Sequence, residues 1–391
     1  MTTEPLSAEL LGAGVVKRST RLADGRELIY YDDADTRLSP DRKADTRIAA
    51  PRPTTASMRQ DAYTGDWITF ATNRQNRVTM PSAEADPLAP QSPTNPSELP
   101  SLYDVAVFEN RSPAFGPALA EAVGDVAAAV DPVRGLDDLT GIGLGRTRTS
   151  TGRCEVVCFS PEHEGSFGTQ SVGRARTVIE AWADRTAALS ALPGVEQVFP
   201  FENRGEAIGV TLPHPHGQIY AYPYITPRTR ALLRSAERTG PDLMARVLEF
   251  EQRGPRVVLQ GDKWTAFVPF AARWPLEVHL MPHRPVPDFA ALHDGERNEL
   301  ARLYLRLLRG VDALYDSPTP YIAAWHQAPV SIGRDTVRMR LELTSPRRAA
   351  DKMKFLAGSE AAMGAWTAEI LPEVAAERLR AAVDSVPIPE E

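Results

Sequence analysis

The sequence has few cysteines and no long apolar run. Only Cys154 and Cys158 occur among 391 residues, which argues against a disulfide framework and favours a reducing, cytoplasmic environment. Both lie in the strand-like stretch 154–159 and are expected to be free, buried thiols on one side of a sheet. No apolar run approaches the roughly 20 residues that span a bilayer, and the amino terminus lacks the layout of a secretion signal. A membrane partner is therefore not expected.

Basic residues are also in the minority. Lysine and arginine number 44 against 51 aspartates and glutamates, and the formal net charge is −7. Without a basic patch, the sequence predicts no nucleic-acid partner. Proline, in contrast, is abundant, with 34 residues. The prolines crowded into 81–100 predict a loop there, because this composition sustains neither a helix nor a central strand.

Apolar periodicity predicts an α+β fold with a mostly antiparallel sheet and flanking helices. Residues 1–50 are expected to form a partly ordered arm, and residues 112–150 a surface insertion with a short helix near 117–130. Two blocks of strands and helices follow one another, the first ending at 213–216 and the second at 276–282. Strands are expected near 154–159, 195–202, 218–222, 256–260, 264–269, 276–281, 321–326 and 337–344, and helices near 171–190, 228–252 with a break at 240–241, 294–315 and 373–384.

One polar segment is the strongest candidate for chemistry. The HPHGQ run at 214–218 places His214, His216 and Gln218 on one face of an extended chain, because side chains alternate with a period of two. Pro215 lacks an N–H, so this is not an ordinary central strand. A neutral imidazole has a lone pair suited to attack phosphorus, and a nearby amide can hydrogen-bond the phosphoryl oxygens. The alternative is a structural pair of histidines or two ligands of one metal.

Several segments resemble galactose-1-phosphate uridylyltransferases of the histidine-triad superfamily, and the resemblance covers most of the chain. It implies a histidine-triad-like fold duplicated within the chain, with an N-terminal half at 1–225 that carries the nucleophile and a C-terminal half at 226–391. The matching segments lie, in family order, at 19–32, 107–111, 201–220, 321–329 and 354–360.

The resemblance also implies a reaction. His216 would be the nucleophile that carries UMP, and Gln218 would stabilise the uridylylated phosphorus. UDP-glucose would uridylylate the histidine and release glucose 1-phosphate, and galactose 1-phosphate would then leave with the UMP as UDP-galactose. The implied substrate-binding set comprises Asn110 on the uridine side, Asn203, Gly209 and Thr211 at the nucleotide phosphates, Arg74 and Arg77 at phosphate groups, and Lys354, Phe355 and Glu360 at the hexose phosphate, across a homodimer interface.

The sequence departs from the family at its metal sites. Family members often carry zinc on a Cys-x-x-Cys pair and two histidines. The histidines match His163 and His214, but the cysteine positions hold Asp86 and Ala89. Structural zinc prefers four protein ligands, so these three remaining ligands predict a weak or vacant site.

A second family metal site looks absent from the sequence. His326 matches one of its ligands, but Arg340 and Glu342 replace the His-x-His that should follow, and no second metal is expected. Ser112 also stands where the family usually has an aromatic residue, which puts the base preference in doubt.

Two other functions fit part of this pattern. A related nucleotidyltransferase or phosphorylase would use the same histidine chemistry on ADP-sugars or dinucleoside polyphosphates, although the match at 354–360 argues against it. A non-catalytic paralogue that binds nucleotide sugars would explain the lost metal ligands, although the intact HPHGQ motif argues against that.

Overall fold

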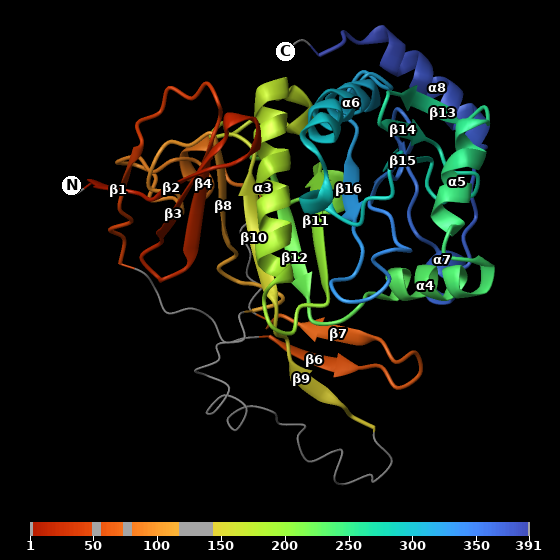
Figure 1. The fold of residues 1–391 in the computed structure, drawn as a ribbon, viewed down its shortest axis with the longest axis horizontal. Helices are drawn as coiled ribbons and strands as arrows, with labels where there is room; N and C mark the ends of the chain where they lie inside the picture. Colours follow the sequence, from red (N-terminus) through yellow and green to blue (C-terminus); the bar gives the residue numbers. More distant parts are fainter. Residues whose placement is uncertain (1–2, 49–55, 73–79, 117–143, 390–391) are drawn as a thin grey trace.

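A twelve-stranded sheet forms the centre of the protein (Figure 1). The computed structural model describes residues 3–48, 56–72, 80–116 and 144–389. Every neighbouring pair of strands in this sheet is antiparallel, which confirms the predicted α+β fold. Across the sheet the strands are β13 (Val257–Gln260), β14 (Trp264–Phe267), β15 (Leu276–Pro282), β17 (Arg340–Ser345), β16 (Tyr321–His326), β11 (Gln197–Arg204), β12 (His216–Tyr222), β10 (Arg153–Cys158), β8 (Val105–Glu109), β4 (Glu27–Asp32), β3 (Val16–Arg21) and β2 (Ala8–Leu10).

The sheet contains two copies of one arrangement. In the first half the chain runs β10, α3 (Val172–Ser190), β11, β12, and in the second it runs β15, α6 (Asp294–Asp312), β16, β17. In both halves the third strand lies between the other two, and β11 pairs with β16 at the centre. The counterpart of β12 is therefore β17. The sequence suggested two blocks, one ending in the HPHGQ segment and the other at 276–282. That comparison matched the wrong strands, because β15 comes before α6 whereas β12 comes after α3.

Two long helices cover one face of the sheet. α3 and α6 pack against each other and against apolar side chains of β10, β11, β12 and β14 to β17, which together form the main core (Figure 1). The Ser171 hydroxyl accepts a hydrogen bond from the Arg174 amide at the start of α3, and His293 and Glu296 form a reciprocal cap at the start of α6. Such caps satisfy backbone amides that the helix itself leaves unpaired.

The remaining helices agree with the sequence pattern. α4 (Pro227–Thr239) and α5 (Leu243–Gln252) are separated at Gly240, and α8 (Pro372–Ser385) ends the described chain, while α7 (Gly358–Met363) is short. Residues 81–100 contain no strand or α-helix, as expected for a loop. No helix within the described ranges is long and apolar enough to cross a membrane. Three small sheets pair β1 (Thr3–Pro5) with β5 (Asp41–Lys43), β6 (Ser57–Gln60) with β7 (Trp67–Phe70) and β9 (Thr147–Thr149), and β18 (Arg347–Ala349) with β19 (Lys352–Met353).

The amino-terminal arm was predicted to be only partly ordered, and this prediction was wrong. β4 pairs with β8 and β3 with β4, so the arm extends the main sheet. Lys17 and Tyr31 both bond the Asp184 carboxylate of α3, at 2.7 and 2.6 Å. The sequence indicated a possible strand at 26–31, which is β4, but it did not reveal β3, because polar residues occupy most of that strand. The helix expected near 117–130 lies outside the described residues.

A buried carboxyl group makes the stability of this core depend on pH. Glu202 of β11 is 4% exposed and accepts a hydrogen bond from the Tyr321 hydroxyl at 3.0 Å. Burial raises the pKa of Glu202 from 4.5 to about 7, because a buried carboxylate loses its hydration. The folded protein therefore holds this proton between about pH 4.5 and 7, where the unfolded chain has released it.

We expect the free energy of unfolding to fall as pH rises through this window, by about 3 kcal/mol from this group. Glu202→Gln mimics the protonated form, so it should stabilise the protein at pH 8 and have little effect at pH 4. Urea unfolding of both proteins at the two pH values measures this. Parallel stability curves for wild type and variant would contradict the prediction.

Candidate active site

The HPHGQ segment enters the sheet at the start of β12. His216 and Gln218 are half-buried, whereas Gly217 and Ile219 are buried and Ile219 belongs to the core that α3 covers. Gln218 pairs with Phe201 across β11, so both lie on the sheet face opposite α3 and α6. A side chain at Gly217 would come within 2.9 Å of the Phe201 carbonyl oxygen and 2.8 Å of the Phe159 ring. Glycine is therefore required at this close approach.

The His216 ring is oriented by its own loop. Its Nδ1 lies 2.8 Å from the carbonyl oxygen of His214. A carbonyl oxygen only accepts, so Nδ1 carries the proton and donates, and Nε2 carries the lone pair. This tautomer is the one required for attack through Nε2.

Gln218 supplies a second indication of a ligand site. Its Oε1 atom is buried and makes no hydrogen bond with any residue that the structure describes. Buried polar atoms in folded proteins are almost always paired, and this unpaired oxygen is an acceptor that a donor group of a ligand could meet. The same sheet face carries Asn203 near the end of β11, which pairs with Ile322 of β16.

The loop before His216 turns at two glycines. Gly205 and Gly209 have φ angles of 100° and 82°, in the region where residues with a Cβ are strained. The Thr211 carbonyl oxygen beyond them accepts a hydrogen bond from the Met80 amide at 2.7 Å. Arg74 and Arg77, predicted to bind phosphate groups, lie outside the described residues. Met80, the first described residue after them, is bonded to this loop.

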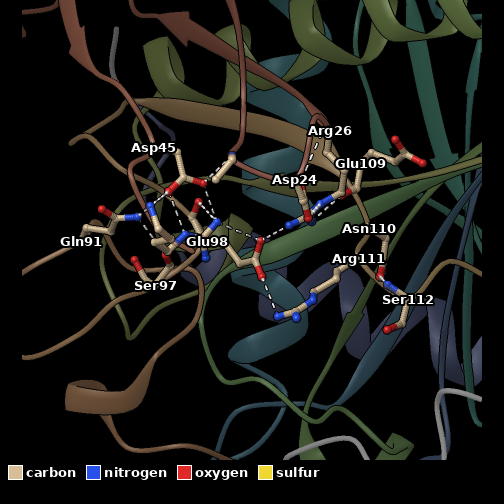
Figure 2. A network of polar contacts seen from close by, with 12 residues as sticks. Asp24, Arg26, Asp45, Gln91, Ser97, Glu98, Glu109, Asn110, Arg111 and Ser112 are labelled. Carbon is tan, nitrogen blue, oxygen red and sulfur yellow. Dashed lines mark hydrogen bonds and ion pairs between the residues drawn. The ribbon is translucent and has the colours of Figure 1, made fainter. Parts of the chain in front are cut away.

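Asn110 begins a tight turn at the end of β8. Its backbone N–H donates to the Cys154 carbonyl oxygen at 2.8 Å. Its side-chain Oδ1 accepts from the Ser112 backbone N–H at 2.9 Å (Figure 2). Cys154 and Cys158 of the adjacent β10 are both buried and form no disulfide, as the sequence predicted.

The predicted hexose-side residues cluster elsewhere, on the C-terminal segment. Lys354 and Glu360 are buried and paired at 3.2 Å, and Lys354 also donates to the Thr367 carbonyl oxygen at 2.6 Å. Phe355 is 80% exposed. Lys354 and Phe355 line a cavity of about 170 Å³ together with residues of the 206–208 turn, Ile322 and Thr344. This cavity lies on the same sheet face as Asn203 and Gln218.

A carboxylate joins the two predicted zinc ligands. Asp86 Oδ2 lies 2.8 Å from His163 Nδ1 and 2.7 Å from His214 Nδ1, and His214 Nε2 lies 2.8 Å from the Ser160 carbonyl oxygen. Burial would raise the pKa of Asp86, but hydrogen bonds and charge attraction from His214 and His163 outweigh it and lower the pKa to about 2. Asp86 is therefore a carboxylate at neutral pH.

These residues offer a zinc ion three side-chain ligands, one fewer than structural sites prefer. Asp86 bonds both histidines directly. His214 Nε2 donates its proton to a carbonyl oxygen, and Ala89 has no donor atom. The described residues contain no group of three or more His, Cys, Asp or Glu placed to hold a metal. Tyr103, whose hydroxyl lies 3.1 Å from His214 Nε2, was not identified from the sequence, because no local motif marks it.

Ion pairs occupy the equivalent position in the second half. Arg340 starts β17 as His216 starts β12, and Glu342 matches Gln218. Glu342 Oε1 accepts from Arg340 at 2.6 Å, and its Oε2 lies 2.7 Å from Arg228 and 3.4 Å from His326. Burial would raise the pKa of Glu342, but attraction to His326 and Arg340 keeps it below its usual range. Arg228, which completes the cluster, was missed because it is distant in sequence.

Comparison with known proteins agrees with this arrangement. A galactose-1-phosphate uridylyltransferase of Streptomyces lividans is 43% identical over 94% of this chain and 98% of its own length. That of Thermotoga maritima is 31% identical over 83% of this chain and 97% of its own. A solved uridylyltransferase structure superimposes with a TM-score of 0.72 and 29% identity, covering 84% of this chain and 98% of the other.

Sequence models of one family match nearly the whole chain. The model of the galactose-1-phosphate uridyl transferase N-terminal domain matches residues 47–226, and that of the C-terminal domain matches residues 236–388. The first match contains the HPHGQ motif, and the second contains the cluster of Lys354, Phe355 and Glu360. With this coverage and the similarity of its relatives, the chain belongs to the galactose-1-phosphate uridylyltransferase family of nucleotidyltransferases.

Proposed function

We propose that this enzyme transfers UMP from UDP-glucose to galactose 1-phosphate through a covalent intermediate on His216. The orientation of the His216 ring carries the proposal. Its Nδ1 proton is used by the His214 carbonyl oxygen at 2.8 Å, which leaves the lone pair on Nε2. An imidazole in this state attacks phosphorus without a separate base.

The reaction has two half-steps. Nε2 of His216 attacks the α-phosphorus of UDP-glucose, the N–P bond forms, and the bond to the leaving oxygen breaks as glucose 1-phosphate departs. A phosphate oxygen of galactose 1-phosphate then attacks the same phosphorus, the N–P bond breaks, and UDP-galactose leaves. Gln218 would donate from its side-chain Nε2 to a phosphoryl oxygen in both steps, because it is the polar side chain nearest to His216 along β12.

The substrate would lie along the sheet face opposite α3 and α6. Asn110 would meet the uridine, and the loop of Asn203, Gly209 and Thr211 would meet the phosphates. Arg74 and Arg77 would add positive charge there. Lys354, Phe355 and Glu360 would receive the hexose phosphate of a partner chain.

The exposure of this last cluster supports a homodimer. Phe355 and Met363 are both 80% exposed and Leu356 is 46% exposed, and a second copy would cover this apolar surface. The two free cysteines support a reducing, cytoplasmic compartment. We further propose that the chain binds zinc weakly or not at all and has no second metal, because the remaining ligand atoms bond each other.

Intact-mass spectrometry tests the covalent step. The protein mixed with UDP-glucose and no acceptor should gain the mass of one UMP per chain, and galactose 1-phosphate should then remove it. Gain of mass with ADP-glucose instead would favour a related phosphorylase or adenylyltransferase. Binding of UDP-glucose without any gain of mass would favour a non-catalytic paralogue, and would overturn the proposal.

A further inference from the structure

The amino-terminal segment lies outside the residues that the family models match, because the first of them begins at residue 47. The structure nevertheless places its strand β4 directly beside β8, the strand that leads into Asn110, and β3 on the far side of β4. We propose that this segment positions the nucleotide-contacting turn 110–112 through one buried side chain, Arg26. The inference rests on the proposed role of Asn110 at the uridine.

Arg26 reaches the turn from the start of β4. Its side chain is 1% exposed, and its Nη1 donates to the carbonyl oxygen of Glu109 at 2.9 Å (Figure 2). Glu109 is the last residue of β8, so this carbonyl belongs to the peptide that leads into Asn110. Burying a guanidinium is costly unless its donors are paired. One donor of this buried guanidinium is therefore paired with the Glu109 carbonyl oxygen.

Both ends of that peptide are held. Arg26 binds its carbonyl oxygen, and its N–H, on Asn110, donates to the Cys154 carbonyl oxygen at 2.8 Å. A peptide unit is planar, so fixing both ends fixes its rotation. The Asn110 side chain is in turn fixed by accepting from the Ser112 amide at 2.9 Å. Losing Arg26 would free the Glu109 carbonyl end of this peptide. The orientation of Asn110, including its side-chain amide, would then be less fixed.

Carboxylates hold Arg26 in place from the other side. Its Nε pairs with Asp24 at 2.7 Å and its Nη2 with Glu98 of the proline-rich loop. Glu98 also lies 4.0 Å from Arg111 within the turn and 3.7 Å from Arg47 (Figure 2). The network thus ties the amino-terminal segment, the proline-rich loop and the turn together. Glu98 is the shared acceptor, so the network depends on it as well as on Arg26.

Arg26→Met keeps an unbranched but shorter side chain and removes every donor. Arg42→Met is the matched control, because Arg42 is 4% exposed and pairs with Asp32 at the other end of β4, away from the turn. Both variants should lower the melting temperature. Only Arg26→Met should raise the Kd for UDP, by about tenfold in calorimetry, and speed hydrogen exchange in residues 105–116. Arg26→Lys should recover part of the affinity.

Equal Kd values for UDP in the Arg26→Met and Arg42→Met variants would overturn the inference. If Arg26→Met does not fold, Glu98→Gln and Arg26→Lys serve in its place, and unchanged UDP affinity in both would likewise overturn it. A wild-type protein that binds no UDP would reject the proposed function itself. Wild-type binding with no selective effect of Arg26 would reject only the positioning role.

Discussion

Replacing His216 by glycine is expected to abolish labelling by UDP-glucose and to lower kcat/KM by roughly 10⁴-fold or more. The loss would follow from removal of the atom proposed to bond phosphorus, for which the neighbouring side chains offer no substitute. Gln218 is an amide, and the His214 nitrogens are used by Asp86 and Ser160. Intact-mass spectrometry and a steady-state assay of UDP-galactose formation measure the two effects.

The control is a histidine on the same sheet face in the second half. His279 of β15 lies 3.3 Å from the Glu277 carboxylate, and we assign it a structural role. His279→Gly should still accept UMP. Circular dichroism must show that His216→Gly keeps its fold. A folded His216→Gly protein that is labelled as fully as wild type would refute the assignment of the nucleophile.

Replacing Asp86 by alanine should lower the free energy of unfolding by about 3 kcal/mol, because it leaves two histidines without their shared acceptor. The kcat should fall by roughly 10²-fold as well, since His214 carries the carbonyl oxygen that orients His216. Urea unfolding and single-turnover labelling measure these effects. Glu84→Ala, in the same loop but exposed, should change neither quantity.

A double variant tests whether Asp86, His163 and His214 form a metal-free clamp, in which the carboxylate bonds both histidines, or a metal site. Asp86→Cys with Ala89→Cys supplies two thiolates beside His163 and His214, and should bind about one zinc per chain. Plasma mass spectrometry should find far less than one zinc on the wild type. A wild type that retains one zinc per chain through purification, and loses stability with a chelator, would contradict the metal-free clamp.

The sequence alone determined the features that depend on local spacing. The two long helices follow from apolar periodicity, and their predicted bounds differ from those of α3 and α6 by only one to three residues. The HPHGQ motif was identified because its polar residues recur every second position. The loss of both thiolates at Asp86 and Ala89 was equally visible, since it is a change of residue type.

Only the tertiary structure decided how distant residues bond. The family resemblance had grouped Asp86 with His163 and His214, which lie 77 and 128 residues further along the chain, and the structure shows that the carboxylate bonds both histidines. Arg26 reaches the Glu109 carbonyl oxygen across 83 residues. Such contacts arise from the order of strands in the sheet, which no local pattern encodes. For the same reason the structure alone matched β17 with β12 and turned a predicted arm into part of the main sheet.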